Sequence, residues 1–335
     1  MNKKENWLRL VSNDHPGWIG PPWEAFAGNR MKNIFIDDPI SRSMFVDEPV
    51  YDVPRKDAWG VSWLWLTGSV AQTPYVTAEN KALRDVNAWR ETVVFPPLDG
   101  FDWTPFKRFV ASIDRTEYLT MCMVTGGLFE RSHYLMGFED ALCNYVENPE
   151  SMYELLGAIA DWKIGHIERI IDNLNPDVVH YHDDWGNKAN LFLHPDVWRA
   201  IIKPHHGRIV DAVKRRGLLF MHHADCFCEP IAEDMAEMGI DIWQGVIPQN
   251  DILAIQRQLN GRMALIGGID APIIDTPDWD EREIRQEIRR CIDTYCPNGR
   301  FIPCIPNITP LFEEVETIYH DELTRYGKDF YGHLP

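Results

Sequence analysis

Two short apolar runs of the sequence, at 218–221 and 301–303, each end in side chains that can bind a metal ion. The side chains that follow them are His222, His223, Asp225, Cys226, Cys228 and Cys304. Imidazole, carboxylate and thiolate groups are the ligands that zinc prefers in proteins. A dry protein core rarely gathers so many polar groups without a task. The cluster therefore predicts a zinc site with room left for a substrate.

Each of these residues also has an ordinary structural interpretation. A buried cysteine is usually a small core hydrophobe, and a histidine at the end of a strand often only bonds a neighbouring loop. It is the whole cluster, taken with Cys304, that favours metal binding. Alternation along a strand would put His223 and Asp225 on one face, and His222 and Ala224 on the other.

The chain from about residue 116 onward alternates short apolar strands with longer helices. The predicted strands are 118–125, 177–182, 218–223, 240–246, 263–266 and 301–304. The predicted helices are 138–146, 149–173, 195–216, 229–238, 251–259, 279–295 and 312–330. This alternation is typical of parallel βα units. We count six units, whereas eight would close a barrel, so the missing two must lie in the first 115 residues.

We therefore predict an α/β fold, a (β/α)8 TIM barrel that forms a single domain over residues 1–335. Its regular βα units span 116–335. Residues 1–115 form an irregular N-terminal extension, rich in Trp and Pro, that includes the first strands. The catalytic face of such a barrel lies at the carboxyl ends of its strands, which is where both metal-capable clusters fall.

The bulk composition limits the class of partner and the compartment. Of the 335 residues, 45% are hydrophobic and 25% charged, as in an ordinary globular protein. No apolar run could cross a membrane and the N-terminus has no apolar signal core, so we expect a cytoplasmic protein. Seven irregularly spaced cysteines indicate reduced thiols. A formal charge of −18 argues against nucleic acid or an anionic membrane as a partner.

Further polar residues at strand ends are expected around the same pocket. They are His182, Asp183, Asp184, Trp185 and Gln244. Of the two carboxylates, Asp184 is the better candidate to orient a substrate group. Either carboxylate could instead only bond a loop or the start of a helix. Gln244 is a weaker candidate for the pocket wall than His182.

The sequence contains thirteen tryptophans, which is many for its length. The segment 59–66 alternates like a half-buried hairpin strand, with Trp59, Trp63 and Trp65 on one face. The ordinary interpretation is that these rings pack in the core. The functional interpretation is an aromatic wall beside the pocket, with Trp63 binding a flat substrate.

Several fragments of the chain, in their order and spacing, resemble one family. They are residues 57–63, Asp183-Asp184-Trp185-Gly186 with Pro195 and Pro204 after it, His223 with Met238-Gly239-Ile240-Asp241 after it, and Gly267-Gly268-Ile269-Asp270. Together they resemble the uroporphyrinogen decarboxylase superfamily. Within it, the chain resembles the corrinoid-dependent methyltransferases, or demethylases, rather than the true decarboxylases.

The resemblance implies a zinc ion bound by a His-x-Cys pair and a distant cysteine. His223 matches the histidine, and Cys304 best matches the distant cysteine. The chain departs from the family pattern at the middle ligand, because Asp225 stands where the family has cysteine and Cys226 follows where it usually has glycine. The strand register favours Asp225, whereas the affinity of zinc for sulfur favours Cys226. Both stay candidates.

The resemblance also implies a reaction. A methyl group would pass from a small donor, such as an aryl methyl ether in an O-demethylation, to the cobalt of a separate corrinoid protein. Zinc would bind the donor heteroatom as a Lewis acid. We expect Asp184, His223 and Cys304 to be catalytic. The expected partners are the corrinoid protein and a small methylated substrate. A second copy of the chain, in a homodimer, is a further candidate partner.

Two other classes of protein could use the same barrel. A metal-free decarboxylase or lyase would keep the pocket acids without needing the cysteine. True decarboxylases of the superfamily share an Arg-rich N-terminal signature, and the corresponding residues 16–23 contain no arginine. A substrate with many carboxylates needs several cations, which weakens that alternative. The other alternative is a non-catalytic barrel that only binds a corrinoid protein.

Overall fold

The structure of the chain is a computed structural model that describes residues 1–44, 50–69, 71–328 and 330–333. At its centre lies a sheet of six parallel strands, each paired with the next along the chain. The strands are β4 (Met121–Val124), β5 (Val178–His182), β6 (Leu219–His223), β7 (Ile242–Val246), β8 (Ala264–Gly268) and β9 (Phe301–Cys304). Each overlaps one of the six predicted strands, so the prediction of parallel βα units is confirmed.

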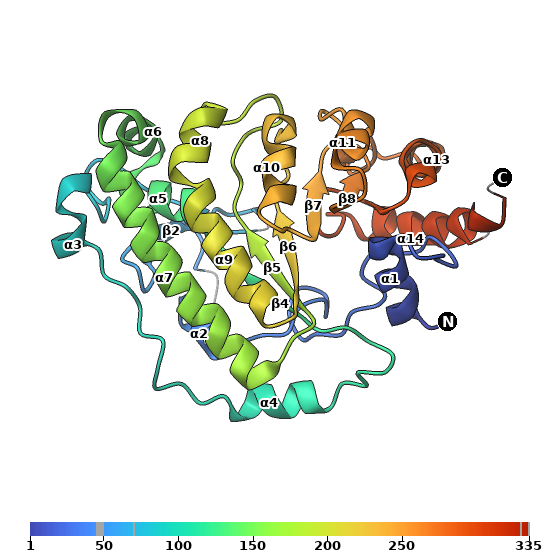
Figure 1. Ribbon diagram of the computed structural model, residues 1–335, viewed down its shortest axis with the longest axis horizontal. Coiled ribbons are helices and arrows are strands. Elements are labelled where there is room, and N and C mark those ends of the chain that lie inside the picture. Colours follow the sequence, from blue (N-terminus) through green and yellow to red (C-terminus); the bar gives the residue numbers. More distant parts are fainter. Residues whose placement is uncertain (45–49, 70, 329, 334–335) are drawn as a thin grey trace.

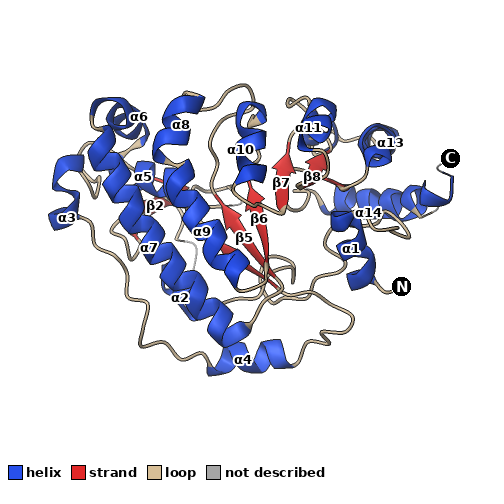
Figure 2. Ribbon diagram, in the orientation of Figure 1, coloured by secondary structure: helices blue, strands red, loops and turns tan. Residues whose placement is uncertain are grey.

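Helices connect these strands and cover the outer side of the sheet (Figures 1 and 2). They are α5 (Leu128–Met136), α6 (Phe138–Glu147), α7 (Pro149–Leu174), α8 (Pro195–Ile201), α9 (Lys203–Arg215), η2 (Glu229–Ile231), α10 (Ala232–Glu237), α11 (Ile252–Leu259), α12 (Ala271–Ile274), α13 (Glu281–Tyr295), η3 (Cys296–Asn298), α14 (Glu313–Gly327) and η4 (Phe330–His333). The single helix predicted over 195–216 is wrong, because the chain breaks at Ile202. Pro204 lies in the first turn of α9, where it has no N–H to continue the preceding helix.

The N-terminal third consists of small elements. They are α1 (Lys3–Ser12), α2 (Pro39–Met44), β1 (Arg55–Lys56), β2 (Ser62–Leu64), β3 (Thr73–Pro74), η1 (Val86–Ala88), α3 (Trp89–Thr92) and α4 (Thr104–Ala111). The three strands form a separate antiparallel sheet. Its middle strand, β2, carries Trp63 and lies within the hairpin strand predicted at 59–66.

The missing first part of the barrel lies next to β4. Phe26 and Leu119 form a parallel bridge, and so do Ile36 and Cys122. The backbone N–H of Ile36 donates to the carbonyl oxygen of Met121 over 2.8 Å. The segment 25–36 therefore continues the sheet beyond β4, in contacts too short to give the alternating pattern by which a strand is predicted.

The parallel strands are buried on both faces, as helix-covered parallel strands are. All residues of β4, β7, β8 and β9 are buried. The carboxyl ends of these strands, and the loops that follow them, are where polar side chains collect. No helix within the described residues is long and apolar enough to cross a lipid bilayer.

A buried contact between Asp38 and His166 fastens the N-terminal part to the barrel. Asp38 precedes α2 and accepts a hydrogen bond from the backbone N–H of Ser41 over 2.9 Å. Its carboxylate also lies 3.1 Å from Nε2 of His166, on α7. Both side chains are almost fully buried. Burial favours the neutral carboxyl, but His166 and Ser41 outweigh it and lower the pKa of Asp38.

Replacing Asp38 by Asn keeps the shape of the side chain and removes its charge. We expect Asp38→Asn to lower the free energy of unfolding by about 1–3 kcal/mol, because it removes a hydrogen bond made by a buried charged group. Urea unfolding followed by circular dichroism measures the change. As a matched control, Asp99→Asn removes an exposed carboxylate paired with Arg169, and should leave the stability nearly unchanged.

The same pair predicts how stability depends on pH. Because the folded protein lowers the pKa of Asp38, its stabilising effect is complete above the ordinary carboxylate pKa, about 4, and is lost as the pH falls through the lower folded value. The difference between the wild type and Asp38→Asn should therefore shrink on acidification. A difference that grows in acid would contradict this account of the pair.

Candidate active site

Three inward-facing side chains stand beside one another on adjacent strands. In the register of the sheet, His182 of β5 is paired with His223 of β6. His223 is in turn paired with Gln244 of β7. Paired residues of neighbouring strands point to the same face, and the two histidine rings stack with centroids 4.4 Å apart and 20° between their planes. The register alone therefore assembles the centre of the site.

His182, Asp184 and His223 form a group that could bind a metal ion, called here the ligand group. One ligand atom of each residue lies within 4.8 Å of the others. Asp225 lies beside the group, and its backbone N–H donates to Oδ1 of Asp184 over 3.1 Å. That bond ties together the loops that follow β5 and β6. In the part of the chain that the structure describes, no other group of three His, Cys, Asp or Glu side chains meets this spacing.

Each histidine of the ligand group is held through its Nδ1 atom. Nδ1 of His182 lies 3.0 Å from Oε2 of Glu130. Nδ1 of His223 contacts Oε1 of Gln244, and Nε2 of Gln244 donates to the carbonyl oxygen of Pro306 over 3.1 Å. With a proton on each Nδ1, the Nε2 lone pairs are left for a metal ion. Partners of this kind orient metal-binding histidines and raise their affinity.

The two histidines differ in charge. Burial opposes a proton on His182, but Glu130 and Asp184 raise its pKa to about 10. Burial and the charge on His182 lower the pKa of His223 to about 4, so this ring is neutral. Burial also raises the pKa of Asp184, to about 6. His223 can thus bind a cation directly, whereas His182 must first release the proton on Nε2.

The start of α5 sets the position of Glu130. Asp183, which follows β5, accepts hydrogen bonds from the backbone N–H groups of Phe129 (3.1 Å) and Glu130 (2.9 Å). A carboxylate at this end of a helix binds N–H groups that have no partner within the helix. The approach is so close that a Cβ atom on Gly127 would lie 2.2 Å from Cβ of Asp183. Only glycine fits there.

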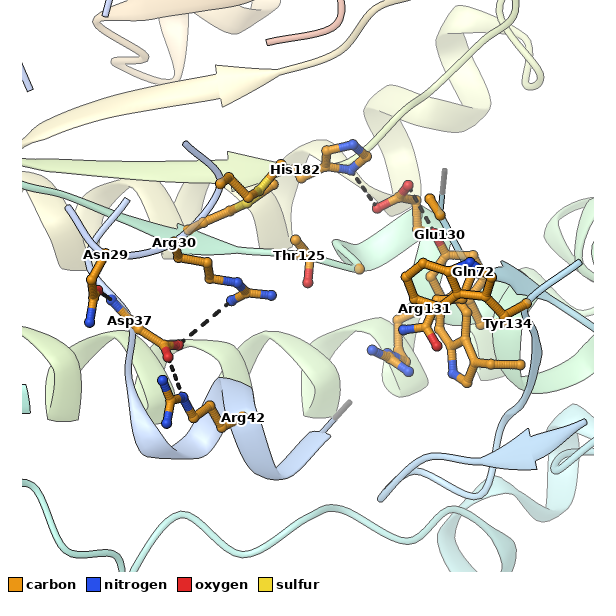
Figure 3. Close-up of a pocket in the computed structure, with 16 residues that line it drawn as sticks. Asn29, Arg30, Asp37, Arg42, Gln72, Thr125, Glu130, Arg131, Tyr134 and His182 are labelled. Carbon is orange, nitrogen blue, oxygen red and sulfur yellow. Dashed lines mark hydrogen bonds and ion pairs between the residues drawn. The ribbon is translucent and has the colours of Figure 1, made fainter. Parts of the chain in front are cut away.

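A cavity of about 800 Å³ opens beside the ligand group. His182 and Glu130 belong to its wall (Figure 3). Its large apolar side chains are Met31, Trp63, Trp65, Met123 and Tyr134. Its cationic side chains other than histidine are Arg30, Arg42 and Arg131. Figure 3 shows Arg30 and Arg42 on the opposite side of the cavity from Arg131. The volume suits a small organic ligand.

The structure brings together only some of the predicted zinc ligands. His223 belongs to the ligand group and Asp225 lies beside it. β6 ends at His223, so the regular strand on which the choice between Asp225 and Cys226 depended does not reach residue 225. Cys226 is buried outside the group, with its Sγ 3.4 Å from Sγ of Cys228.

Cys304 also lies outside the ligand group. It is the last residue of β9 and is fully buried. Burial raises the pKa of its thiol to about 12, although a hydrogen bond with Tyr319 opposes this. A protonated, buried thiol is a poorer metal ligand than a thiolate. The side chains that stand ready in this geometry therefore offer nitrogen and oxygen rather than sulfur.

The predicted substrate-binding residues fall into two sets. Trp63 and His182 line the cavity. Gln244 is fully buried and holds His223. Asp183 and Trp185 are buried, with Nε1 of Trp185 donating to the Asp183 carboxylate over 3.0 Å. Neither is part of the cavity wall, and Asp183 acts on the site through α5.

The sequence interpretation missed the charged half of the cavity. Glu130 gave no signal beyond the paired glycines at 126–127, which mark a close approach of the helix start to its neighbour. The segment 16–23, which corresponds to the Arg-rich signature of the true decarboxylases, has no arginine. Arg30 and Arg42 lie just beyond it, and Arg131 lies a hundred residues later on α5.

Comparison with known proteins agrees with this architecture. A solved structure of a methyltransferase from Methanosarcina mazei matches with a TM-score of 0.59 at 15% sequence identity, covering 80% of this chain and 76% of that chain. At this identity the likeness shows the fold alone. No curated protein matches the sequence. The model of the uroporphyrinogen decarboxylase (URO-D) family matches residues 72–303, and the chain therefore belongs to this family and has a (β/α)8 barrel fold.

Proposed function

We propose that this protein is a zinc-dependent methyltransferase. It would move a methyl group from a small donor, such as an aryl methyl ether, to the cobalt of a corrinoid protein. One observation carries the proposal. Two oriented histidines and a carboxylate lie within 4.8 Å of one another beside a cavity of about 800 Å³.

The ligand group fits zinc in number and in kind. Catalytic zinc commonly has three protein ligands from His, Asp, Glu or Cys and keeps a fourth position open. His182, Asp184 and His223 would hold the ion, with Glu130 and Gln244 fixing the two rings. Bound there, zinc would supply Lewis acidity to the heteroatom that carries the methyl group.

The chain's own residues would bind and orient the donor. Trp63, Trp65 and Tyr134 give the cavity a flat apolar wall suited to an aromatic ring. The nucleophile would belong to the corrinoid, so the cavity needs no activated serine or lysine. This division of labour, in which a cofactor carries the hard step and the protein positions the reactants, is common among enzymes.

The first test concerns the metal. Protein purified without chelator should contain about one zinc per chain. His223→Ala should lose the metal, because it removes a nitrogen ligand that no neighbour replaces. Cys304→Ser is the matched control and should keep it, since Cys304 lies outside the ligand group. Elemental analysis measures the zinc content of each variant. Zinc lost from both variants would favour the ligands that the family resemblance implies, because His223 belongs to both sets, and zinc kept in His223→Ala would contradict the ligand group.

A second test concerns the residue that orients His223. Gln244→Leu should lower zinc affinity by about 10–100-fold, the usual effect of removing an outer partner of a metal-binding histidine. Gln244→Glu retains an oxygen acceptor and should lose much less. Competition with a chelating dye measures both affinities. Equal affinities for the wild type and Gln244→Leu would show that this contact does not matter for metal binding.

The third test concerns the donor. With reduced corrinoid protein, a methoxylated aromatic should be demethylated faster than methanol or methylamine, as followed by cobalt absorbance. Trp63→Ala should lower kcat/KM for the aromatic donor by about two- to tenfold, the range of one aromatic contact. Trp103→Ala, outside the cavity wall, is the control. Faster turnover of methanol would remove the aryl preference and leave the methyltransferase.

The chelator separates the competing classes. Methyl transfer should stop when the metal is removed and return with added zinc. A decarboxylase or lyase on the same barrel would release its product in the presence of chelator. A barrel that only binds a corrinoid protein would form the complex without turning over any donor.

A further inference from the structure

We propose that the cavity contains a carboxylate-binding position at Arg131, so that the methyl donor is an aromatic acid rather than a neutral ether. The inference deepens the proposed function by naming the substrate class. It depends on that function only for the identity of the reaction, because an anion can bind here whether or not methyl transfer occurs. Its basis is the environment of one buried guanidinium.

Arg131 is a buried cation with unused hydrogen-bond donors. Its side chain is 4% exposed and belongs to the cavity wall. Among the described residues its guanidinium makes a single hydrogen bond, from Nη1 to Oδ2 of Asp57, and that bond is long at 3.4 Å. Its Nε has no partner. A buried charged group that leaves most of its donors unpaired is costly unless a ligand completes it.

The nearby carboxylates are already occupied. Oδ2 of Asp57 accepts a hydrogen bond from Nε1 of Trp63 over 2.8 Å. Its Oδ1 accepts hydrogen bonds from the backbone N–H groups of Trp59 and Val61, over 2.9 Å each. Glu130 accepts from His182 and from the hydroxyl of Tyr134, each over 3.0 Å. Neither carboxylate is available to form a close, two-pronged pair with Arg131.

The surroundings of Arg131 are those of an aromatic ligand site. The guanidinium carbon lies 4.6 Å from the ring centre of Trp59 and 5.5 Å from that of Tyr134. Both distances are within the range of a cation–π contact. The planar fork of arginine donates two parallel bonds to a carboxylate. The carboxylate of a benzoic acid would thus pair with Arg131, and its ring would contact the flat apolar side chains of the wall.

The position of the cavity fits this orientation. Glu130 and Arg131 are consecutive on α5, and Glu130 bonds His182 of the ligand group. A donor whose carboxylate is held by Arg131 would therefore lie along the same wall as the proposed zinc. The chain as a whole carries −18, and a local cation of this kind favours the binding of an anionic donor against that background.

Calorimetric titration with benzoate and benzamide tests the proposal without requiring turnover. The two probes share their shape and differ in charge. The wild-type protein should bind benzoate at least about tenfold more tightly than benzamide, the lower range for a hydrogen-bonded charge. Equal affinities would overturn the proposal, and this comparison needs no variant.

Variants then assign the effect to one side chain. Arg131→Gln should lose the preference for benzoate while keeping the affinity for benzamide, and Arg131→Lys, which keeps the charge without the planar fork, should fall between. Arg262→Gln removes an exposed arginine paired with Glu233 and should change nothing. A benzoate preference that survives in folded Arg131→Gln would place the carboxylate elsewhere, for example on the metal, and overturn the assignment.

Turnover distinguishes this inference from the proposed function. 4-Methoxybenzoate should be demethylated with a higher kcat/KM than methoxybenzene, and Arg131→Gln should remove the difference. If methoxybenzene is the better donor, the carboxylate position is wrong and the methyltransferase stands. If benzoate binds through Arg131 and no donor loses its methyl group, the carboxylate position stands and the methyltransferase is wrong.

Discussion

The register of three parallel strands fixes the arrangement of the polar side chains at the mouth of this barrel. Because β5, β6 and β7 run in register, His182, His223 and Gln244 must face inward at neighbouring positions. A slip of one residue turns every side chain of a strand to its other face. In β6 such a slip would replace His223 by His222 on the inner face. His222 now stacks on Trp185 on the other, helix-covered face of the strand, so the slip would break up the ligand group.

The buried charges around this centre form one continuous network. Asp183 binds the start of α5, which places Glu130, and Glu130 holds His182 against Asp184. Buried charges are tolerated when each has a partner. The network therefore specifies where α5 sits relative to the sheet as well as the orientation of a histidine. Arg131 stands out because the protein supplies so little of its pairing.

The sequence was sufficient for the parts of the fold that repeat. Strand and helix alternation located all six regular strands, and an apolar run ending in polar residues located His223. It did not locate the first part of the barrel, since the pairs at Phe26 and Ile36 are isolated bridges without a periodic pattern. It also could not find Glu130 or Arg131, because only the folded backbone brings α5 to the strand ends. The cysteines were predicted as ligands from their place at the strand ends as well as from the resemblance, and no local rule shows whether Cys304 faces the site.

The close contact at Gly127 fixes one part of the cavity wall, the part formed by α5. With no room between α5 and the loop after β5, these segments cannot slide past each other, so the wall that bears Glu130 keeps its place relative to His182. The N-terminal segment that carries Trp63 and Trp65 belongs to the other part of the cavity wall, so changes of its side chains can alter ligand preference without moving α5. Trp63 is tied to Asp57 and through it to Arg131, whereas no such bond among the described residues ties Trp65 to Arg131, which makes Trp65 the natural starting point for redirecting this barrel to new compounds.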